Sequence, residues 1–468
     1  MNRPDIEGGA GGRRLQHVAD SARRRAPLDD MNALNHSAAP LLHQSAPRYL
    51  TYPAREWFVE AFGPEELERW LDTILLIEPQ RSMSVSVRVP ATAGEPSRAD
   101  AWLRALHEEA RLYRKRGRAQ REIGEIHCSE AAGWLQVDQF ERLLDTLSSG
   151  FRWTAGARTT VALDPACVSP GVAETLSWLS AIVALDVNIG FAPVHPGRGA
   201  DDGGAPAETP RPRGLALAAT VRRAAPEASI GIALEYGGAW QPLDELTLRL
   251  DAMAAFRPQR VLLRETDTAP GTAGRAAAAA ARARMTVLRH IADRLETAGY
   301  VRVGPDYYAQ PDDPVAVAQR LGCATLTPYG MSALPGASTL ALGPAAVGSL
   351  GAVYYENQRT EAAYFDALRQ GHLPAERGLR LTGDDLLRRA VIQSLACNQF
   401  IDIGAIEDGH GVDFGRYFAR ELAELTPFER SGLIDCAADA IEAVGDGLLV
   451  LGALCRVFDS YARRRRWR

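Results

Sequence analysis

Six short hydrophobic segments alternate with amphipathic helical patterns, and this alternation limits the fold of the chain more than any other feature. Strands that alternate with helices pair in parallel, with the helices packed outside the sheet. The order predicts an α/β fold of six βα units in a partial barrel, with its functional face at the C-terminal ends of the strands. The predicted strands are 83–89, 122–127, 159–163, 185–190, 229–234 and 260–263, and the predicted helices between them are 99–117, 137–148, 171–181, 214–224 and 243–256.

Composition divides the chain into three parts. Residues 1–44 carry a glycine-rich stretch, an Arg-Arg-Arg cluster and little apolar periodicity, so a disordered segment is expected there. Residues 45–355 would form the partial barrel, preceded by a helix over 55–77. Residues 356–468 would form a C-terminal helical domain.

The C-terminal part has the element order of a winged helix. Thr382-Gly-Asp-Asp385 resembles a capping box that opens a helix through Asn398, a second helix is expected over 414–425, and a small hairpin lies between 431 and 447. The chain ends in Arg-Arg-Arg-Arg-Trp-Arg, which we interpret as a solvated tail. Nucleic-acid binding is disfavoured because the candidate recognition helix is acidic around Glu421 and Glu424.

Charge and hydropathy exclude several classes. The 468 residues carry a net charge of −5 and 46% hydrophobic residues, which gives no general attraction to nucleic acid or to anionic membranes. No apolar run reaches the roughly 18 residues that span a bilayer, and the N-terminus has no apolar signal core. Free, unpatterned cysteines suit a reducing compartment, so a cytoplasmic protein without membrane contact is expected.

Four collinear segments resemble the oxygen-independent coproporphyrinogen III oxidases: APRYLTYP at 46–53, RVGPDYYAQPDDPVAVAQ at 302–319, RRAVIQSLACN at 388–398 and VFDSYAR at 457–463. The resemblance runs from about residue 45 to the C-terminus. It implies the partial barrel of radical S-adenosylmethionine enzymes, and an activity that decarboxylates two propionates of a heme precursor. It also implies that Arg48, Tyr49 and Tyr52 help to enclose the substrate.

The chain departs from that family where the cofactors would bind. In the family a Cys-x3-Cys-x2-Cys loop after the first strand holds a [4Fe–4S] cluster, whereas here the strand continues into Ala-Thr-Ala-Gly-Glu-Pro-Ser-Arg at 91–98. The six cysteines stand far apart and are interpreted as packing residues: Cys128, Cys167, Cys323, Cys397, Cys436 and Cys455. We therefore expect no cluster, no S-adenosylmethionine, no metal ligand and no catalytic residue.

Other positions that contact the cofactor in the family also carry small side chains here: Ser86, Ala162, Ala192 and Ala233. The barrel mouth should be either an empty cavity or filled by bulkier residues such as Glu130, Trp134 and Phe191. We therefore favour a protein that retains the fold of this family without its catalytic chemistry.

Three functions follow. We favour a catalytically inactive homologue with a tetrapyrrole-binding or regulatory role linked to heme biosynthesis, whose ligand would be porphyrin or heme. The first alternative is an active coproporphyrinogen III oxidase, as the family name implies. The second is a protein-interaction scaffold or a nucleic-acid-binding regulator, which would need a protein or nucleic-acid partner.

Overall fold

The computed structural model describes residues 48–77, 82–116, 122–166, 168–190, 213–237, 242–265, 275–336 and 338–465. The predicted disordered segment 1–44 lies outside these residues. No helix in the described ranges is long and apolar enough to cross a membrane.

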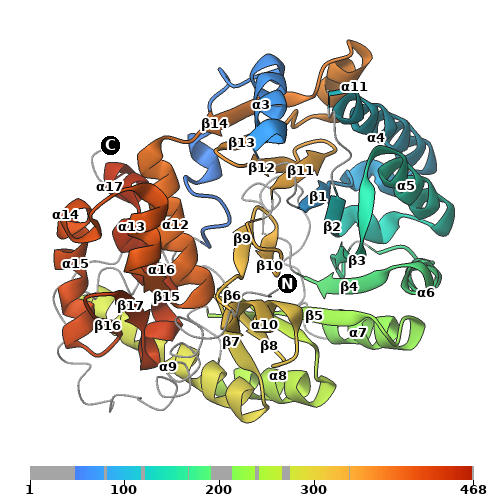
Figure 1. Cartoon of the computed structure of the whole chain (residues 1–468). Coiled ribbons are helices and arrows are strands. Elements are labelled where there is room, and N and C mark those ends of the chain that lie inside the picture. The colour runs from blue at the N-terminus through green and yellow to red at the C-terminus, as the bar shows by residue number, and fades with distance from the viewer. Residues whose placement is uncertain are drawn as a thin grey trace, which may run out of the picture.

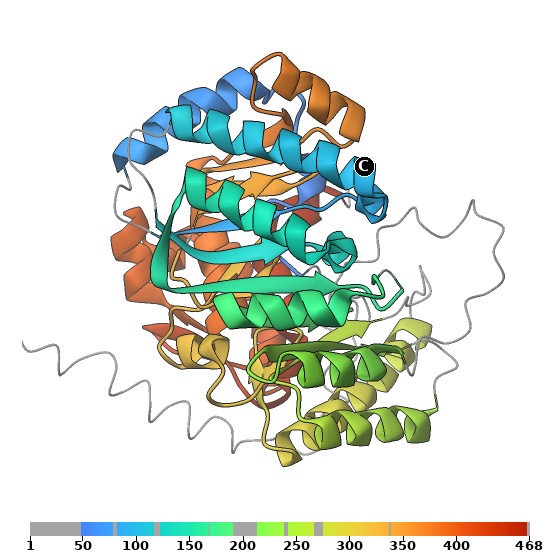
Figure 2. The same cartoon turned by 90° about the vertical axis from the view of Figure 1, so that its right-hand side faces the viewer.

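The six predicted strands are present, and all of them pair in parallel in chain order. Their bounds are β1 (Met83–Val87), β2 (Glu122–Cys128), β3 (Arg152–Leu163), β4 (Ala184–Ile189), β5 (Ser229–Tyr236) and β6 (Arg260–Glu265). A helix stands between each strand and the next: α4 (Pro96–Arg116), α5 (Val137–Gly150), α6 (Val172–Ile182), α7 (Arg213–Ala224) and α8 (Leu243–Phe256). Figure 2 shows these helices, from light blue to yellow-green, covering one side of the strands. The six parallel strands with their intervening helices are confirmed, whereas their curvature into a partial barrel stays a prediction.

Six further strands extend this sheet at both ends. β11 (Thr339–Leu342) pairs in parallel with β1 and is followed by three antiparallel strands, β12 (Val347–Leu350), β13 (Val353–Asn357) and β14 (Ala375–Arg380). Beyond β6, after α9 (Arg275–Thr297), lie β8 (Tyr307–Ala309) and β7 (Val301–Val303). The described twelve-stranded sheet is open, with β14 and β7 as its edges. It continues past residue 355, and the division of the chain there stays a prediction.

The single helix predicted over 55–77 is wrong. The structure has a short 3-10 helix η2 (Arg55–Trp57) and a separate helix α3 (Pro64–Ile77). Between them Val59 pairs with Gly378 of β14, with 2.8 Å from its amide nitrogen to the carbonyl oxygen. Pro64 starts α3 because a residue without an N–H is well suited to the first helical turn.

The C-terminal helices lie beside the sheet (Figure 1). Thr382 and Asp385 form the predicted capping box of α12 (Gly383–Asn398). The helix predicted over 414–425 is two helices, α14 (Phe414–Tyr417) and α15 (Ala419–Arg430), because the chain turns at Phe418. The predicted hairpin is β16 (Ile434–Cys436) and β17 (Ala440–Ala443), which β15 (Phe400–Asp402) completes as a three-stranded sheet. The other helices that follow α12 in the described residues are α13 (Ile403–His410), α16 (Leu451–Phe458) and α17 (Ser460–Arg465), whereas α10 (Pro314–Arg320) and α11 (Glu361–Arg369) precede it.

Candidate functional site: the C-terminal ends of the barrel strands

The loop that follows β1 is a tight turn without metal-binding side chains. β1 runs through Pro90 into the 3-10 helix η3 (Ala91–Gly94), closed by hydrogen bonds from Ala93 to Pro90 and from Glu95 to Thr92, each 3.0 Å. Its side chains are two alanines, one threonine and one glycine, and the Thr92 hydroxyl donates to Glu361 at 2.7 Å. This donor set does not fit a three-thiolate cluster site.

A second short turn packs against η3. The 3-10 helix η4 (Glu130–Trp134) follows β2, and the Trp134 indole covers Gly94, where an added Cβ would lie 3.3 Å from the ring. The Ser129 hydroxyl accepts from the Val89 amide at 2.9 Å, which joins the ends of β1 and β2. Trp134 therefore fills space beside η3, whereas Phe191 and the side chain of Glu130 lie outside the described part of the chain.

The cysteines of the described residues lie outside this turn, and most of them are buried. Cys128, Cys397 and Cys455 are buried, and burial raises the pKa of the Cys128 thiol to about 12. A thiol of raised pKa stays protonated and is a poor metal ligand. Cys323 and Cys436 are partly exposed. Among the described residues no group of three His, Cys, Asp or Glu side chains could hold a metal ion.

The positions that the resemblance relates to cofactor contacts stand on neighbouring strands. Ser86 lies on β1, Ala162 on β3 and Ala233 on β5, and Ala233 lies close to the turn at Gly190, where an added Cβ would be 3.5 Å away. None of these three side chains can ionise, so these positions offer no carboxylate to a bound amine. Ala192 lies outside the described residues.

The three predicted enclosing residues connect the sheet to the C-terminal helices. The Arg48 Nε atom donates to Asp306 at 2.5 Å, and its Nη2 atom donates to the Tyr307 hydroxyl at 3.1 Å. Tyr49 donates to Asp459 at 3.3 Å. We call residues 48–53 the N-terminal strap. In Figure 1 this blue stretch runs between the sheet and the red helices.

The two tyrosines of the strap are interior residues. Tyr49 is 5% exposed and Tyr52 is 2% exposed. The Tyr52 hydroxyl lies 3.2 Å from the Ser460 hydroxyl and also accepts from the Ser460 amide. Burial raises the pKa of both phenols above the usual value, so they stay neutral and act as packed hydrogen-bonding groups. Arg48 differs, because 32% of its side chain is exposed.

A group of charged side chains at the ends of β5 and β6 lies near the strap. Arg284 of α9 holds Glu265 in a bidentate pair at 2.6 and 2.9 Å. Tyr236 lies beside them, and its pKa is raised chiefly by burial and then by the nearby Glu265. Arg264 donates to the Gly190 carbonyl at 2.6 Å. Both guanidinium groups at this edge of the sheet therefore already have an oxygen acceptor within the protein.

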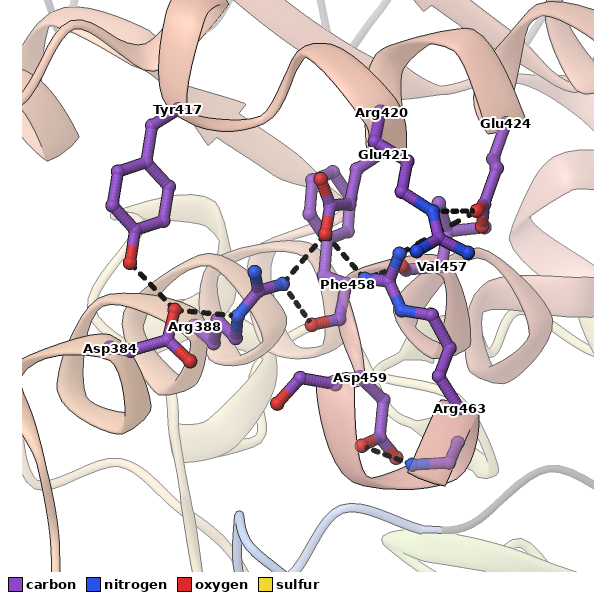
Figure 3. A network of polar contacts seen from close by, with 12 residues as sticks. Asp384, Arg388, Tyr417, Arg420, Glu421, Glu424, Val457, Phe458, Asp459 and Arg463 are labelled. Atoms are coloured by element: carbon purple, nitrogen blue, oxygen red, sulfur yellow. Dashed lines mark hydrogen bonds and ion pairs between the residues drawn. The ribbon is translucent and has the colours of Figure 1, made fainter. Parts of the chain in front are cut away.

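The end of the chain is held by a network of ion pairs that Figure 3 shows. Glu421 of α15, with a side chain 4% exposed, accepts from Arg388 of α12 at 2.9 Å and pairs with Arg463 of α17. Asp459 accepts from the backbone amides of residues 461 and 462 at the start of α17, and so caps this short helix while it also binds Tyr49. The prediction of a solvated tail is wrong for Arg463, because the buried carboxylate of Glu421 attracts its guanidinium.

Sequence reasoning missed part of this site. Asp306 lies within the motif at 302–319, but its partner Arg48 stands 258 positions away. The pair of Glu265 and Arg284 joins a strand end to a helix across residues 266–274. Neither pair has a spacing signal in the sequence, because each depends on the packing of distant elements.

Comparisons with known proteins agree with the resemblance. No protein-family model matches the chain. The chain is 28% identical over 446 residues to the oxygen-independent coproporphyrinogen III oxidase of Salmonella typhimurium, covering 90% of this chain and 94% of the relative. The Escherichia coli relative of the same name is 27% identical over 446 residues, with 90% and 94% of the two chains covered.

A solved structure is similar over nearly the same extent. It is coproporphyrinogen III oxidase from Escherichia coli, described as a radical SAM enzyme, with a TM-score of 0.72 and 26% sequence identity. The match covers 88% of this chain and 97% of that chain. By sequence and by fold together, the chain described here is a homologue of the oxygen-independent coproporphyrinogen III oxidases over most of its length.

Proposed function

We propose that this chain is a catalytically inactive member of its family that binds a tetrapyrrole, porphyrin or heme, in a role linked to heme biosynthesis. The observation that carries the proposal is a contrast between two parts of one site. The loop after β1 offers no thiolate, whereas the N-terminal strap still joins the sheet to the C-terminal helices. A protein that holds a ligand without converting it needs the strap but not the cluster loop.

The chemistry of the donor set supports the loss of activity. In radical S-adenosylmethionine enzymes three thiolates bind a [4Fe–4S] cluster, which supplies the electron that cleaves the cofactor. The turn η3 has no sulfur, and Cys128, the described cysteine at the end of β2, is a buried thiol of raised pKa. No residue of this chain is therefore assigned to a cluster, to S-adenosylmethionine or to a catalytic step.

One arginine of the site can reach a carboxylate of the ligand. Arginine guanidinium groups bind carboxylates through charge-assisted hydrogen bonds. Arg48 is the partly exposed arginine of the strap, and its Nε and Nη2 atoms bind Asp306 and Tyr307, which leaves its Nη1 atom without an acceptor among the described residues. We assign Arg48 to a propionate of the tetrapyrrole.

Titration with coproporphyrin III, followed by its absorbance and by quenching of protein fluorescence, tests this function. We expect saturable binding of one ligand per chain with a micromolar dissociation constant. Arg48→Ala should weaken it about tenfold or more, because a hydrogen bond to a charged group is lost. Arg98→Ala is the control, since Arg98 forms an exposed pair with Glu95. If the titration signal rose linearly without saturating, both with porphyrin and with heme, the tetrapyrrole function would be excluded.

Anaerobic reconstitution with iron and sulfide tests the loss of catalysis separately. We expect no iron or sulfide to remain on the protein after desalting, with the Escherichia coli radical SAM enzyme as the positive control. Stoichiometric iron and sulfide, with an absorbance that bleaches on reduction, would favour an active coproporphyrinogen III oxidase instead.

A protein-interaction function has one observation in its favour. Residues 399–446, which contain the winged-helix-like elements, carry eleven acidic residues and three arginines. This balance opposes nucleic-acid binding and suits a basic protein surface. If the tetrapyrrole titration fails, this acidic unit is the first place to search for a partner.

A further inference from the structure

A polar cavity lies inside the sheet and borders the site described above, because Ser86 and Tyr307 are among its lining residues. Its volume is about 80 Å³, and its charged lining residues are Glu125, Arg158, Asp186 and Arg260. Arg260 is the first residue of β6 and Asp186 the third of β4. The lining also includes Asn188, the fifth residue of β4, so the cavity extends along the strands toward the ends where η3 and the pair of Glu265 and Arg284 lie.

Two ion pairs neutralise most of the charge in the lining. Arg158 holds Asp186 in a bidentate pair, with 2.9 Å from Nε and 2.5 Å from Nη2. The Arg260 Nε atom donates to Asp313 at 2.7 Å, and the side chains of these two residues are 12% and 1% exposed. Each guanidinium is thus held in place by a carboxylate that is almost completely buried, so the wall of the cavity is fixed.

Several hydrogen-bonding groups of the wall remain unused. Within the described ranges, neither the two terminal amino groups of Arg260 nor the amide of Asn188 has a hydrogen-bond partner, although Asn188 is only 9% exposed. Donors that face such a cavity can be satisfied by water or by a ligand that accepts from them. Glu125 supplies an acceptor in the same wall, and its Oε2 atom already accepts from Ser332 at 2.7 Å.

The size of the cavity limits the ligand. One water molecule needs roughly 10–15 Å³ of such space, so 80 Å³ holds about five to eight non-hydrogen atoms. Sites for drug-sized ligands are typically about 300–1,000 Å³. A tetrapyrrole does not fit, so the ligand of this cavity differs from the one proposed above, although Tyr307 of the wall also contacts Arg48 of the strap.

We propose that this cavity binds a small hydroxycarboxylate of about lactate size. Its carboxylate oxygens accept from the terminal amino groups of Arg260 and from the amide of Asn188. Its hydroxyl group donates to Glu125. The burial that raises the pKa of Glu125 also limits the negative charge that the carboxylate meets. The Thr160 side chain completes the wall.

Isothermal titration of the full chain with sodium lactate tests the proposal, with sodium chloride at the same ionic strength as the blank. We expect one saturable site per chain, and weaker binding of acetate, which lacks the hydroxyl group. Asn188→Ala should weaken lactate binding about tenfold, since a hydrogen bond to a charged group is lost. No saturable heat with lactate would overturn the proposal, and so would acetate binding as tightly as lactate.

A matched pair of variants separates a cavity effect from a general loss of stability. Thr160→Val changes the cavity wall, whereas Thr286→Val changes a threonine on α9 whose hydroxyl donates to the Arg282 carbonyl. Lactate should raise the melting temperature of the wild type and of Thr286→Val equally, because a ligand of the folded state stabilises it. The shift should be smaller for Thr160→Val and for Asn188→Ala. Equal shifts in all four proteins would place lactate elsewhere and overturn the assignment. Porphyrin titration of Asn188→Ala should be unchanged, which keeps this test separate from the function proposed above.

Discussion

Glu109 of α4 is a fully buried carboxylate that should make the stability of this protein depend on pH. It accepts from the Gly343 amide at 2.8 Å, from the Asn357 side chain at 2.7 Å and from the Tyr364 hydroxyl at 2.5 Å. Within the described residues it has no ion pair with an arginine or lysine. Burial raises its pKa from the usual 4.5 to about 8, and the three hydrogen bonds oppose that rise.

The sign of the effect follows from the two protonation states. Between pH 4.5 and about 8 the folded protein holds a proton on Glu109 that the unfolded chain has lost. The free energy of unfolding therefore falls as the pH rises, by about 1.4 kcal/mol per pH unit for this group. The stabilisation that protonated Glu109 gives the folded state is complete below pH 4.5 and is lost by about pH 8. The free energy of unfolding changes by at most about 5 kcal/mol over this range.

Urea unfolding of the wild type and of Glu109→Gln, followed by circular dichroism from about pH 5 to 8.5, measures this difference. Glutamine has the same shape and does not titrate, so the wild type should lose stability relative to the variant as the pH rises. Glu108→Gln is the control, because Glu108 is the preceding residue of α4 and forms an exposed pair with Arg111. A constant difference between wild type and Glu109→Gln across the whole pH range would refute the reasoning.

Two further predictions use matched variants and the same unfolding assay. Gly343→Ala should destabilise the fold by about 2 kcal/mol more than Gly299→Ala. Both glycines have a φ near +90°, but only at Gly343 would the new Cβ meet a backbone atom, the Arg88 carbonyl oxygen at 2.3 Å. Arg463→Ala should cost about 1–3 kcal/mol, because it removes one partner of a buried carboxylate, whereas the exposed Arg420→Ala should cost below about 0.5 kcal/mol. Equal losses within either pair would contradict the burial argument.

The parallel core could be predicted because its signal is local. Each of the six strands is a short hydrophobic run followed by a helical pattern, and the structure has them in the expected order. β3 begins at Arg152, seven residues before the predicted start, because its first half is largely exposed and lacks hydrophobic alternation. The strands β11 to β14 were missed because they are only four to six residues long, and because β11, through which they join the parallel strands, pairs with the distant β1.

The site could be predicted only in part, because its contacts depend on burial. The absence of the cysteine loop can be predicted from the sequence, and the structure has the short turn η3 at that position. Glu109, by contrast, follows Glu108 in a helix and looks like another surface acid. Only the packing of β11, β13 and the helix α11 (Glu361–Arg369) against α4 distinguishes a buried carboxylate from an exposed one.

The hydrogen bond between Tyr49 and Asp459 joins residues 410 positions apart, and this separation orders the assembly of the protein during synthesis. At about 5–20 residues per second, Tyr49 is made roughly 20–80 s before its partner. The βα units can pair during that interval, since their contacts join neighbours in sequence. The strap must wait for α16 and α17. A chain released before residue 459 would therefore hold a complete parallel core with its buried tyrosines exposed to solvent, a state that chaperones and proteases recognise.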